Sequence, residues 1–221
     1  DLLTWCTEEN LPLPRTRHFR LGCDLPKEYA GDIRESIARF MRSSVPVFAA
    51  VGTIEPRKNY SMLLRTFERL WLEGVNAHLL IAGRTTGEET DLVERLRMHP
   101  EQGRRLLTLF DASDQELAHV YGHARALVFP SLAEGFGLPL VEARAHDCQV
   151  IASDIPAFRE LEEPGISYFS VGAADQLSRL IVHHADKCNS PPHRTSKPAW
   201  SWAQSSTELL QKIEDLLGQP F

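Results

Sequence analysis

Short apolar runs alternate with helical patterns through most of the sequence. The runs typical of buried strands are Val45–Val51, Ala77–Ala82, Leu106–Phe110, Ala126–Phe129, Val150–Ser153 and Ile166–Phe169. Between the first two runs, apolar residues recur at the spacing that places one stripe on a helix, at Leu63, Leu64, Phe67, Leu70 and Trp71. Repeated units of this kind predict an α/β fold, a Rossmann-like parallel sheet with helices on both faces.

The same helical spacing returns between the later strand candidates. It is carried by Leu92, Val93 and Leu96, then by Leu117, Val120 and Tyr121, and then by Leu177, Leu180 and Ile181. Ser113 and Glu116 have the spacing of a capping box, in which each side chain bonds a free backbone N–H at a helix start. We therefore predict that a helix begins at Ser113.

The pattern predicts one core domain with shorter segments on either side. Residues 25–187 form this core. Residues 1–24 contain two prolines in LPLP and one short apolar stretch, so we interpret them as a tail or linker from a missing N-terminal domain. Residues 188–221 begin with CNSPPHRTSKPAW, whose three prolines interrupt any pattern, and end in a helical stripe. This segment is predicted to be a linker and a C-terminal helix.

The composition narrows the class of protein. With 43% hydrophobic and 24% charged residues, the 221-residue chain is typical of soluble globular proteins. A formal charge of −6 disfavours nucleic acid as a partner, because that class needs lysine and arginine in excess. No apolar run reaches the roughly 18 residues that span a bilayer, and the start lacks a signal-peptide pattern. We expect a cytoplasmic location, which includes a peripheral position at the inner face of the membrane.

Neither the cysteines nor the histidines form a metal-binding pattern. The cysteines are scattered without paired spacing, at Cys6, Cys23, Cys148 and Cys188, which is typical of reduced thiols. His119 and His123 lie four positions apart on a predicted helix, but no cluster supplies further ligands. We predict no metal site and no cofactor, and we interpret the two histidines as part of a solvated helix face.

The densest chemical signal is the segment FPSLAEGFGLPLVEARAHD. It runs from a buried strand ending near Phe129 into a helix starting near Leu138, where Pro139 suits the first turn. The turn Gly135-Phe136-Gly137 then lies at the carboxyl end of a parallel strand, the edge at which open α/β sheets bind ligands. Glycines let the backbone approach a ligand, and the N–H groups of the helix start favour a phosphate. The turn is predicted to cradle an anion.

Two glutamates flank this turn. Glu134 precedes it, and Glu142 is placed in the first turn of the predicted helix, so both carboxylates are expected beside one pocket, where they suit hydroxyl groups. The alternative for Glu142 is that it only stabilises the positive end of the helix dipole. A dinucleotide fingerprint fits poorly because Leu140 stands where glycine or alanine is required, and no Walker A sequence is present.

A basic loop follows the first strand candidate in VFAAVGTIEPRKNY. The strand ends at Gly52, the chain turns at Pro56, and Arg57 and Lys58 come immediately before a helix. An arginine fork and a lysine charge at the same sheet edge as the glycine turn can neutralise a diphosphate. The alternative is that this pair is simply solvated.

Together, GTIEPRKN and EGFGLPLVE closely resemble the C-terminal half of the family 4 retaining glycosyltransferases, which have the two-domain GT-B fold. The second stretch matches the Glu-x7-Glu motif of that family. The resemblance covers about residues 18–186 and includes HFRLGCDL near the entry, ASDIPAFREL after the motif, and Trp202 in the last helix.

The resemblance implies a role for each matching residue. Lys58 and Arg57 would hold the donor diphosphate, and Glu142 would bind the ribose hydroxyls. Glu134 and the backbone of Phe136–Leu138 would hold the sugar. The substrate-binding set is Gly52, Thr53, Arg57, Lys58, Glu134, Gly135, Phe136, Gly137, Leu138 and Glu142, and Glu134 and Lys58 are also the predicted catalytic residues. Some relatives carry an arginine where this chain has Thr53, which makes Arg57 the candidate to supply that phosphate contact.

The predicted function is that of the donor-binding half of a retaining hexosyltransferase. The donor would be a nucleotide diphosphate sugar, with GDP-mannose favoured because GTIEPRKN resembles mannosyl- and rhamnosyl-type members. The acceptor, a glycan or a lipid-linked sugar in cell-surface polysaccharide synthesis, would bind the missing N-terminal domain, without which we expect no transfer. The alternative is a non-catalytic nucleotide-binding module that uses the same cradle.

Overall fold

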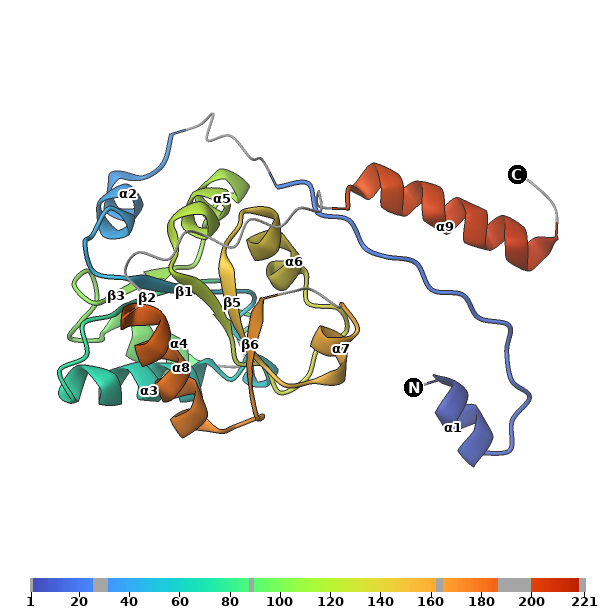
Figure 1. Cartoon of the computed structure of the whole chain (residues 1–221), viewed down its shortest axis with the longest axis horizontal. Helices are drawn as coiled ribbons and strands as arrows, with labels where there is room; N and C mark the ends of the chain where they lie inside the picture. The colour runs from blue at the N-terminus through green and yellow to red at the C-terminus, as the bar shows by residue number, and fades with distance from the viewer. Residues whose placement is uncertain (1, 26–31, 88–89, 162–164, 187–199, 219–221) are drawn as a thin grey trace. The chain divides into compact units, whose positions relative to one another are not determined.

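The computed structural model describes residues 2–25, 32–87, 90–161, 165–186 and 200–218 (Figure 1). The chain divides into two compact units, one formed by residues 1–24 and 200–221 and the other by residues 25–199. The larger unit holds the sheet, and the smaller unit holds the first and last helices that the structure describes.

The described part of the larger unit contains a six-stranded sheet in the order β3-β2-β1-β4-β5-β6, with every neighbouring pair parallel. Its strands are β1 (Val47–Val51), β2 (His78–Ala82), β3 (Leu106–Leu109), β4 (Ala126–Phe129), β5 (Gln149–Ser153) and β6 (Ile166–Phe169). The predicted parallel sheet is confirmed. β1 begins two residues later than predicted, since Pro46 has no N–H to offer the ladder.

Helices cover both faces of the sheet, as predicted (Figure 1). Successive strand residues point to opposite faces. Phe48 and Ala50 pack with one group of helices, α3 (Tyr60–Leu72), α4 (Thr90–Arg97) and α8 (Ala174–Asp186). Ala49 and Val51 pack with the other group, α2 (Glu35–Met41), α5 (Asp114–His123), α6 (Leu138–Ala145) and α7 (Pro156–Arg159). The core therefore consists of two apolar layers, one on each side of the sheet.

The helix starts and stripes follow from the sequence. In α3, Leu63, Phe67 and Leu70 are buried, whereas Leu72 at the end of the helix is 89% exposed. Fully burying one such side chain contributes about 1.5–3 kcal/mol. Before α5, the Glu116 amide donates to Ser113 Oγ at 3.3 Å, and the Ser113 amide donates to Glu116 Oε2 at 3.0 Å. The predicted capping box is confirmed.

The smaller unit pairs the start of the chain with its last helix. It contains α1 (Leu2–Glu8) and α9 (Trp202–Leu217), and α9 begins with a second capping box formed by Ser201 and Gln204. The Cys23 amide donates to the Trp200 carbonyl at 2.7 Å. This pairing of distant segments was not predicted. None of the helices described here combines the length and apolar composition needed to cross a bilayer.

Candidate functional site

The strand order reverses between β1 and β4, which lie side by side in the middle of the sheet. In open α/β sheets, ligands bind outside the carboxyl ends of the strands at such a switch point. The loop after β1 begins at Gly52, and the loop after β4 contains Glu134. A backbone hydrogen bond joins the two loops, from the Leu132 amide to the Arg57 carbonyl at 2.7 Å. The two predicted motifs therefore meet at the edge where a ligand is expected.

Gly52 leaves the backbone bare beside a lysine. Its φ of 138° lies in a region that favours glycine, and a Cβ there would lie 3.5 Å from Lys58 Nζ. Lys58 ends a short 3-10 helix (Pro56–Lys58), and Asn59 in the left-handed conformation then starts α3. The Tyr60 hydroxyl donates to the Gly52 carbonyl at 3.2 Å. These contacts fix the loop so that the ammonium group lies against the end of β1.

The carboxylate of Glu134 bridges the two cations. Its Oε1 lies 2.6 Å from Lys58 Nζ, and its Oε2 lies 2.6 Å from an Arg57 nitrogen. Ser131 Oγ donates to the same carboxylate at 2.7 Å. The side chains of Lys58 and Glu134 are only 7% and 6% exposed, so this ion pair is shielded from water. The structure thus brings Glu134 together with Lys58 and Arg57, which lie 76 and 77 positions earlier in the sequence.

The charges in this cluster balance. Arg57 also pairs with Glu55 at 2.6 Å, so two cations face two carboxylates. Burial alone would raise the pKa of Glu134, but hydrogen bonds from Lys58 and Ser131, together with the nearby positive charges, hold it below its usual value. Glu134 is therefore ionised at neutral pH, and its negative charge is already matched by the cations beside it.

The glycine turn lies directly at the start of α6. Gly137 is the N-cap of α6 with φ 94°, and a Cβ there would lie 2.7 Å from the Phe158 ring, so only glycine fits. Pro139 lies in the first turn, as predicted. A Cβ on Gly135 would meet no atom of the described chain within 4 Å, which leaves space at the turn. Phe136 and Leu138, beside these glycines, are half-buried.

Glu142 lies deeper in α6 than predicted. The helix begins at Leu138, so Glu142 is its fifth residue and the first turn contains no acidic residue. The prediction that Glu142 lies in the first turn is wrong. The helix-dipole alternative is correspondingly weaker, because the dipole effect falls off beyond the first turn. Instead, Glu142 Oε2 accepts a hydrogen bond from the Tyr121 hydroxyl at 2.9 Å.

Burial dominates the electrostatics of Glu142. It raises the pKa of this carboxyl above its usual value, the Tyr121 hydrogen bond opposes the rise, and the charge of Asp114 adds to it. Asp114 also lines a cavity of about 260 Å³ at the carboxyl ends of β1, β2 and β3, together with Gly52 and Thr53. The charge of Asp114 thus acts on Glu142, and Asp114 also lines the cavity beside the cation cluster.

Arg84 lines the same cavity and was missed by the sequence analysis. It follows Gly83, where a Cβ would lie 1.9 Å from the Gly52 carbonyl oxygen, so the ends of β1 and β2 touch only because this residue is glycine. The Arg84 side chain is exposed and forms no hydrogen bond or ion pair with the residues that the structure describes. A glycine followed by arginine at the end of a second strand was the available sequence signal.

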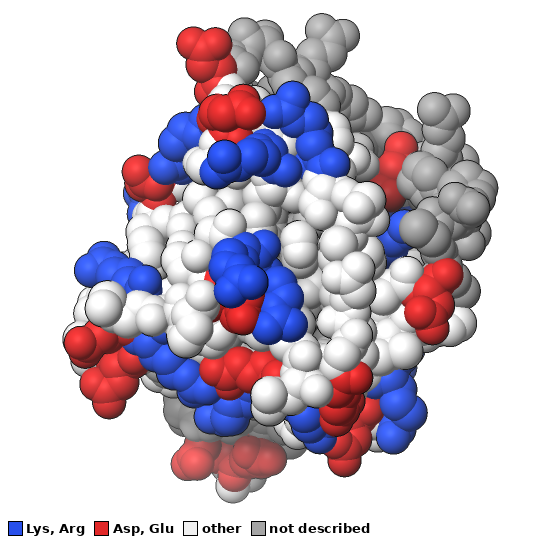
Figure 2. Space-filling view, turned by 90° about the vertical axis from the view of Figure 1, so that its left-hand side faces the viewer, with Lys and Arg blue, Asp and Glu red and all other residues white. Residues whose placement is uncertain are grey.

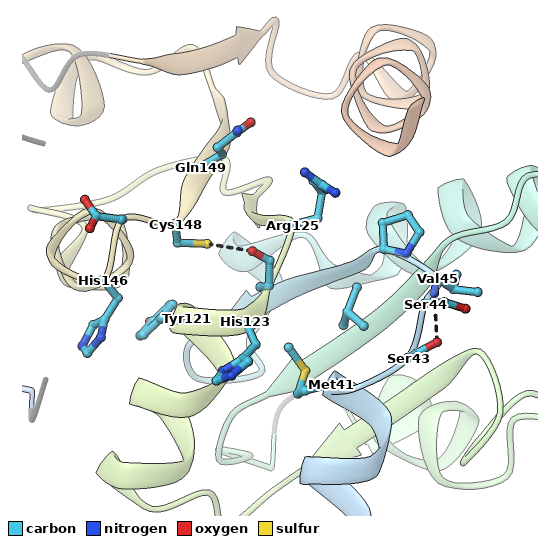
Figure 3. A pocket seen from close by; sticks show the side chains of 15 residues that line it. Met41, Ser43, Ser44, Val45, Tyr121, His123, Arg125, His146, Cys148 and Gln149 are labelled. Atoms are coloured by element: carbon cyan, nitrogen blue, oxygen red, sulfur yellow. Dashed lines mark hydrogen bonds between the residues drawn. The ribbon is translucent and has the colours of Figure 1, made fainter. Parts of the chain in front are cut away.

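A second cavity of about 290 Å³ lies at the opposite edge of the sheet (Figure 3). Its walls include Val47, Gln149 and Arg125, which stand at the amino ends of β1, β5 and β4. No predicted site residue lines it. Burial raises the pKa of the Cys148 thiol in its wall to about 12, which leaves the sulfur unreactive at neutral pH.

The described surface shows no arrangement for a metal ion. No group of three or more His, Cys, Asp or Glu residues is placed to hold one among the residues described. The rings of His119 and His123 lie 4.1 Å apart, but further ligands do not join them in this part of the chain.

Basic and acidic side chains are interspersed over the face shown in Figure 2. Local clusters, and not one broad field, therefore set the charge that a ligand would meet there.

Proteins of similar sequence include mannosyltransferases. The chain is 35% identical to the serotype-specific mannosyltransferase WbdA of Escherichia coli over 96% of its own length and 27% of that relative. It is also 35% identical to the O-antigen chain mannosyltransferase RfbU of Salmonella typhimurium, over 55% of the chain and 33% of that relative. The chain thus spans about a third or less of the length of these relatives.

Solved structures share the fold at lower sequence identity. The sucrose-phosphate synthase of Thermosynechococcus elongatus superposes with a TM-score of 0.73 at 20% identity, over 97% of this chain and 56% of that one. Anabaena HepE, solved in complex with UDP and glucose, superposes with a TM-score of 0.72 at 15% identity. The match covers 96% of this chain and 60% of HepE. These likenesses confirm the predicted fold, the Rossmann-like parallel sheet of the GT-B type.

The family itself is established by a match to a family model. The model of the family described as glycosyl transferases group 1 matches residues 34–184, which include the loop after β1, the glycine turn and both glutamates. That match covers more than half of the chain, and WbdA adds its similarity over nearly the whole of it. The chain belongs to the group 1 glycosyl transferases.

Proposed function

We propose that the carboxyl edge of the sheet binds a nucleotide diphosphate sugar and that the chain is the donor-binding part of a retaining hexosyltransferase. The observation that carries this proposal is the bridge from Glu134 to Lys58 and Arg57 beside a glycine turn at the switch point. Two cations and a helix start at one place suit a diphosphate, and the adjoining carboxylates suit hydroxyl groups.

The diphosphate would exchange places with the Glu134 carboxylate on the cations. Lys58 and Arg57 then hold the phosphate oxygens, and Glu134 turns to the hydroxyls of the sugar, whose other contacts come from the backbone of Gly135–Leu138. Because Glu134 and Glu55 already match the charges of Lys58 and Arg57, the negative charge of the diphosphate calls for a further cation. Arg84, which lines the adjoining cavity with Thr53, supplies it.

In the transfer step, the cations act on the leaving group. Breaking the bond between the sugar and the diphosphate builds negative charge on the departing phosphate, and Lys58 is placed to stabilise that charge in a water-shielded position. Glu134, which orients the sugar, is the second residue at the reacting centre. The ribose of the nucleotide lies against Glu142, and its base occupies the cavity between Gly52 and Phe110.

The relatives favour mannose as the sugar. WbdA and RfbU are named as mannosyltransferases, and RfbU as an enzyme of O-antigen chains. By that similarity we propose GDP-mannose as the donor and a glycan or lipid-linked acceptor of cell-surface polysaccharide synthesis, bound by a part of the protein other than residues 25–199.

A calorimetric screen of GDP, UDP and TDP against the chain tests the donor proposal. We expect GDP to bind most tightly, and each diphosphate to bind more tightly than its nucleoside. Preference for UDP would overturn the choice of donor but leave the site standing. Failure of every diphosphate to bind would overturn the site, whereas binding without transfer by a longer protein that contains this chain would favour the non-catalytic module.

A further inference from the structure

Tyr121 is held rigidly between α5 and α6. Its side chain is fully buried in the apolar layer that contains Val120, Leu140 and Ala143. The ring stacks on His146 with centroids 6.0 Å apart, and it borders the amino-edge cavity beside His146 and His123 (Figure 3). Packing against these neighbours restricts the rotamer of the buried ring and so sets the position of its hydroxyl.

That fixed hydroxyl meets one oxygen of Glu142 and leaves the other. Tyr121 donates to Glu142 Oε2 at 2.9 Å. Glu142 Oε1 receives no hydrogen bond from the residues that the structure describes, so it keeps its capacity to accept. A glutamate has three rotatable side-chain bonds, and one hydrogen bond to a rigid partner selects among its rotamers. The orientation of the free oxygen is therefore set from α5, a different helix.

The tyrosine also acts on the charge of the carboxylate. Burial and the charge of Asp114 favour the protonated form, whose acid proton would occupy one acceptor position, whereas the Tyr121 hydrogen bond favours the ionised form. An ionised carboxylate accepts stronger hydrogen bonds than a neutral one. The Tyr121 hydroxyl thus both orients the Glu142 carboxylate and favours its ionised form, and both effects strengthen Glu142 as an acceptor.

We infer that Tyr121 is a positioning residue for nucleotide recognition: its hydroxyl holds Glu142 so that Oε1 accepts hydrogen bonds from the ribose diol. This inference rests on the proposed role of Glu142 at the ribose. Tyr121 itself touches no substrate in this account. Its effect on binding must therefore pass through Glu142, which separates it from a tyrosine that merely satisfies its own buried hydroxyl.

The test compares GDP and UDP with their 2′-deoxy analogues on four proteins: the parent chain, Tyr121→Phe, Glu142→Gln and the double variant. Tyr121→Phe removes only the hydroxyl. Loss of one hydrogen bond corresponds to about two- to tenfold in affinity. We expect a loss in that range for the ribonucleotides and a smaller loss for the deoxy analogues. In the Glu142→Gln background, Tyr121→Phe should add less than about twofold, because the two residues act as one unit.

Tyr168→Phe serves as the matched control, because the Tyr168 hydroxyl also donates to an internal acceptor, the Phe158 carbonyl, at 3.1 Å. It should affect ribo and deoxy ligands alike, and melting temperatures should show that all variants fold. If Glu142→Gln discriminates the sugars but Tyr121→Phe does not, the inference is wrong while the ribose role stands. If Glu142→Gln weakens both ligands equally, the ribose role of Glu142 fails and the inference fails with it, while the diphosphate site stands. If no diphosphate binds, the proposed function itself fails.

Discussion

The two glutamates of one short motif lie in opposite environments. Glu134 is held by Lys58, Arg57 and Ser131, and these partners lower the pKa of its carboxyl despite its burial. Glu142, eight positions later, has one neutral partner in Tyr121, and burial raises the pKa of its carboxyl. The same residue type is thus a counter-ion in one place and, in the other, a hydrogen-bond acceptor with a raised pKa.

This contrast suits the two glutamates to different parts of a donor, one charged and one uncharged. The surroundings of Glu134 suit a ligand that brings negative charge and displaces a carboxylate from its cations. Those of Glu142 suit uncharged hydroxyl groups, which the Tyr121 hydrogen bond helps it to accept. A diphosphate and a ribose need these two kinds of contact at neighbouring places.

The largest expected effect is at the charged end. Lys58→Ala should weaken binding of a nucleoside diphosphate by about ten- to hundredfold, since a hydrogen bond to a charged group contributes roughly 1.5–3 kcal/mol. Calorimetry with the matching nucleoside should show little loss, because an uncharged ligand makes no phosphate contact. Arg65→Ala, at an exposed position of α3, is the control and should change neither affinity. Equal losses for both ligands would refute a phosphate role.

The next effect concerns the ribose end. Glu142→Gln keeps the shape and an acceptor oxygen but removes the charge, so it should weaken a ribonucleotide by about 1–2 kcal/mol. The 2′-deoxy analogue already lacks part of that contact and should lose less. Titration of both nucleotides into both proteins measures this difference. Strictly additive losses would count against ribose binding and would leave Glu142 with a structural role only.

Arg84 gives a smaller expected effect because it is exposed. Arg84→Ala should weaken diphosphate binding by about 0.5–1.5 kcal/mol, and the loss should shrink as salt rises, because exposed charges are screened. Titrations at low and high ionic strength supply the measurement. A salt-independent loss, or no loss at all, would show that Arg84 is not the third cation that contacts the diphosphate.

The smallest effect is a pH dependence confined to the ribose end. Because the folded pKa of Glu142 is raised, protonation starts at a higher pH than for an ordinary glutamate, and the preference for ribo over deoxy ligands should fade as pH falls through it. Burial is the main cause of the raised pKa, the Tyr121 hydrogen bond opposes it, and the charge of Asp114 adds to it. Both ligands carry the same phosphates, so the ratio of the ribo to the deoxy affinity does not depend on the titration of the phosphates. In Glu142→Gln the ratio should be flat with pH, and a flat ratio in the parent chain would contradict this assignment.

Much of the fold could be predicted because its signals are local. The strand runs, the apolar stripe of α3 and the capping box at Ser113 each depend on residues close together in sequence. Parallel pairing then brings the carboxyl ends of β1 and β4 to one edge, so the meeting of the Gly52 loop and the glycine turn was also predictable.

The remaining features depend on contacts that local patterns do not record. The bridge from Glu134 to Lys58 joins positions 76 residues apart. Tyr121 was predicted only as part of an apolar stripe, because helical spacing does not reveal which acceptor its hydroxyl meets. The start of α6 near Leu138 was predicted correctly, but Glu142 is the fifth residue from that start, so its place beyond the first turn could have been read from the sequence. Arg84 follows a glycine at the end of β2, but only the pairing of β2 with β1 shows that this glycine brings it beside Gly52.

Backbone amide chemical shifts during titration with GDP test the location of the site most directly, because they report which edge of the sheet meets the ligand. We expect the largest changes at Gly52, Thr53 and Lys58 and at Gly135–Leu138, with the shifts of Ser43 and Gln149 at the amino-edge cavity almost unchanged. Changes concentrated at that cavity, with the Gly52 loop and the glycine turn silent, would contradict the account.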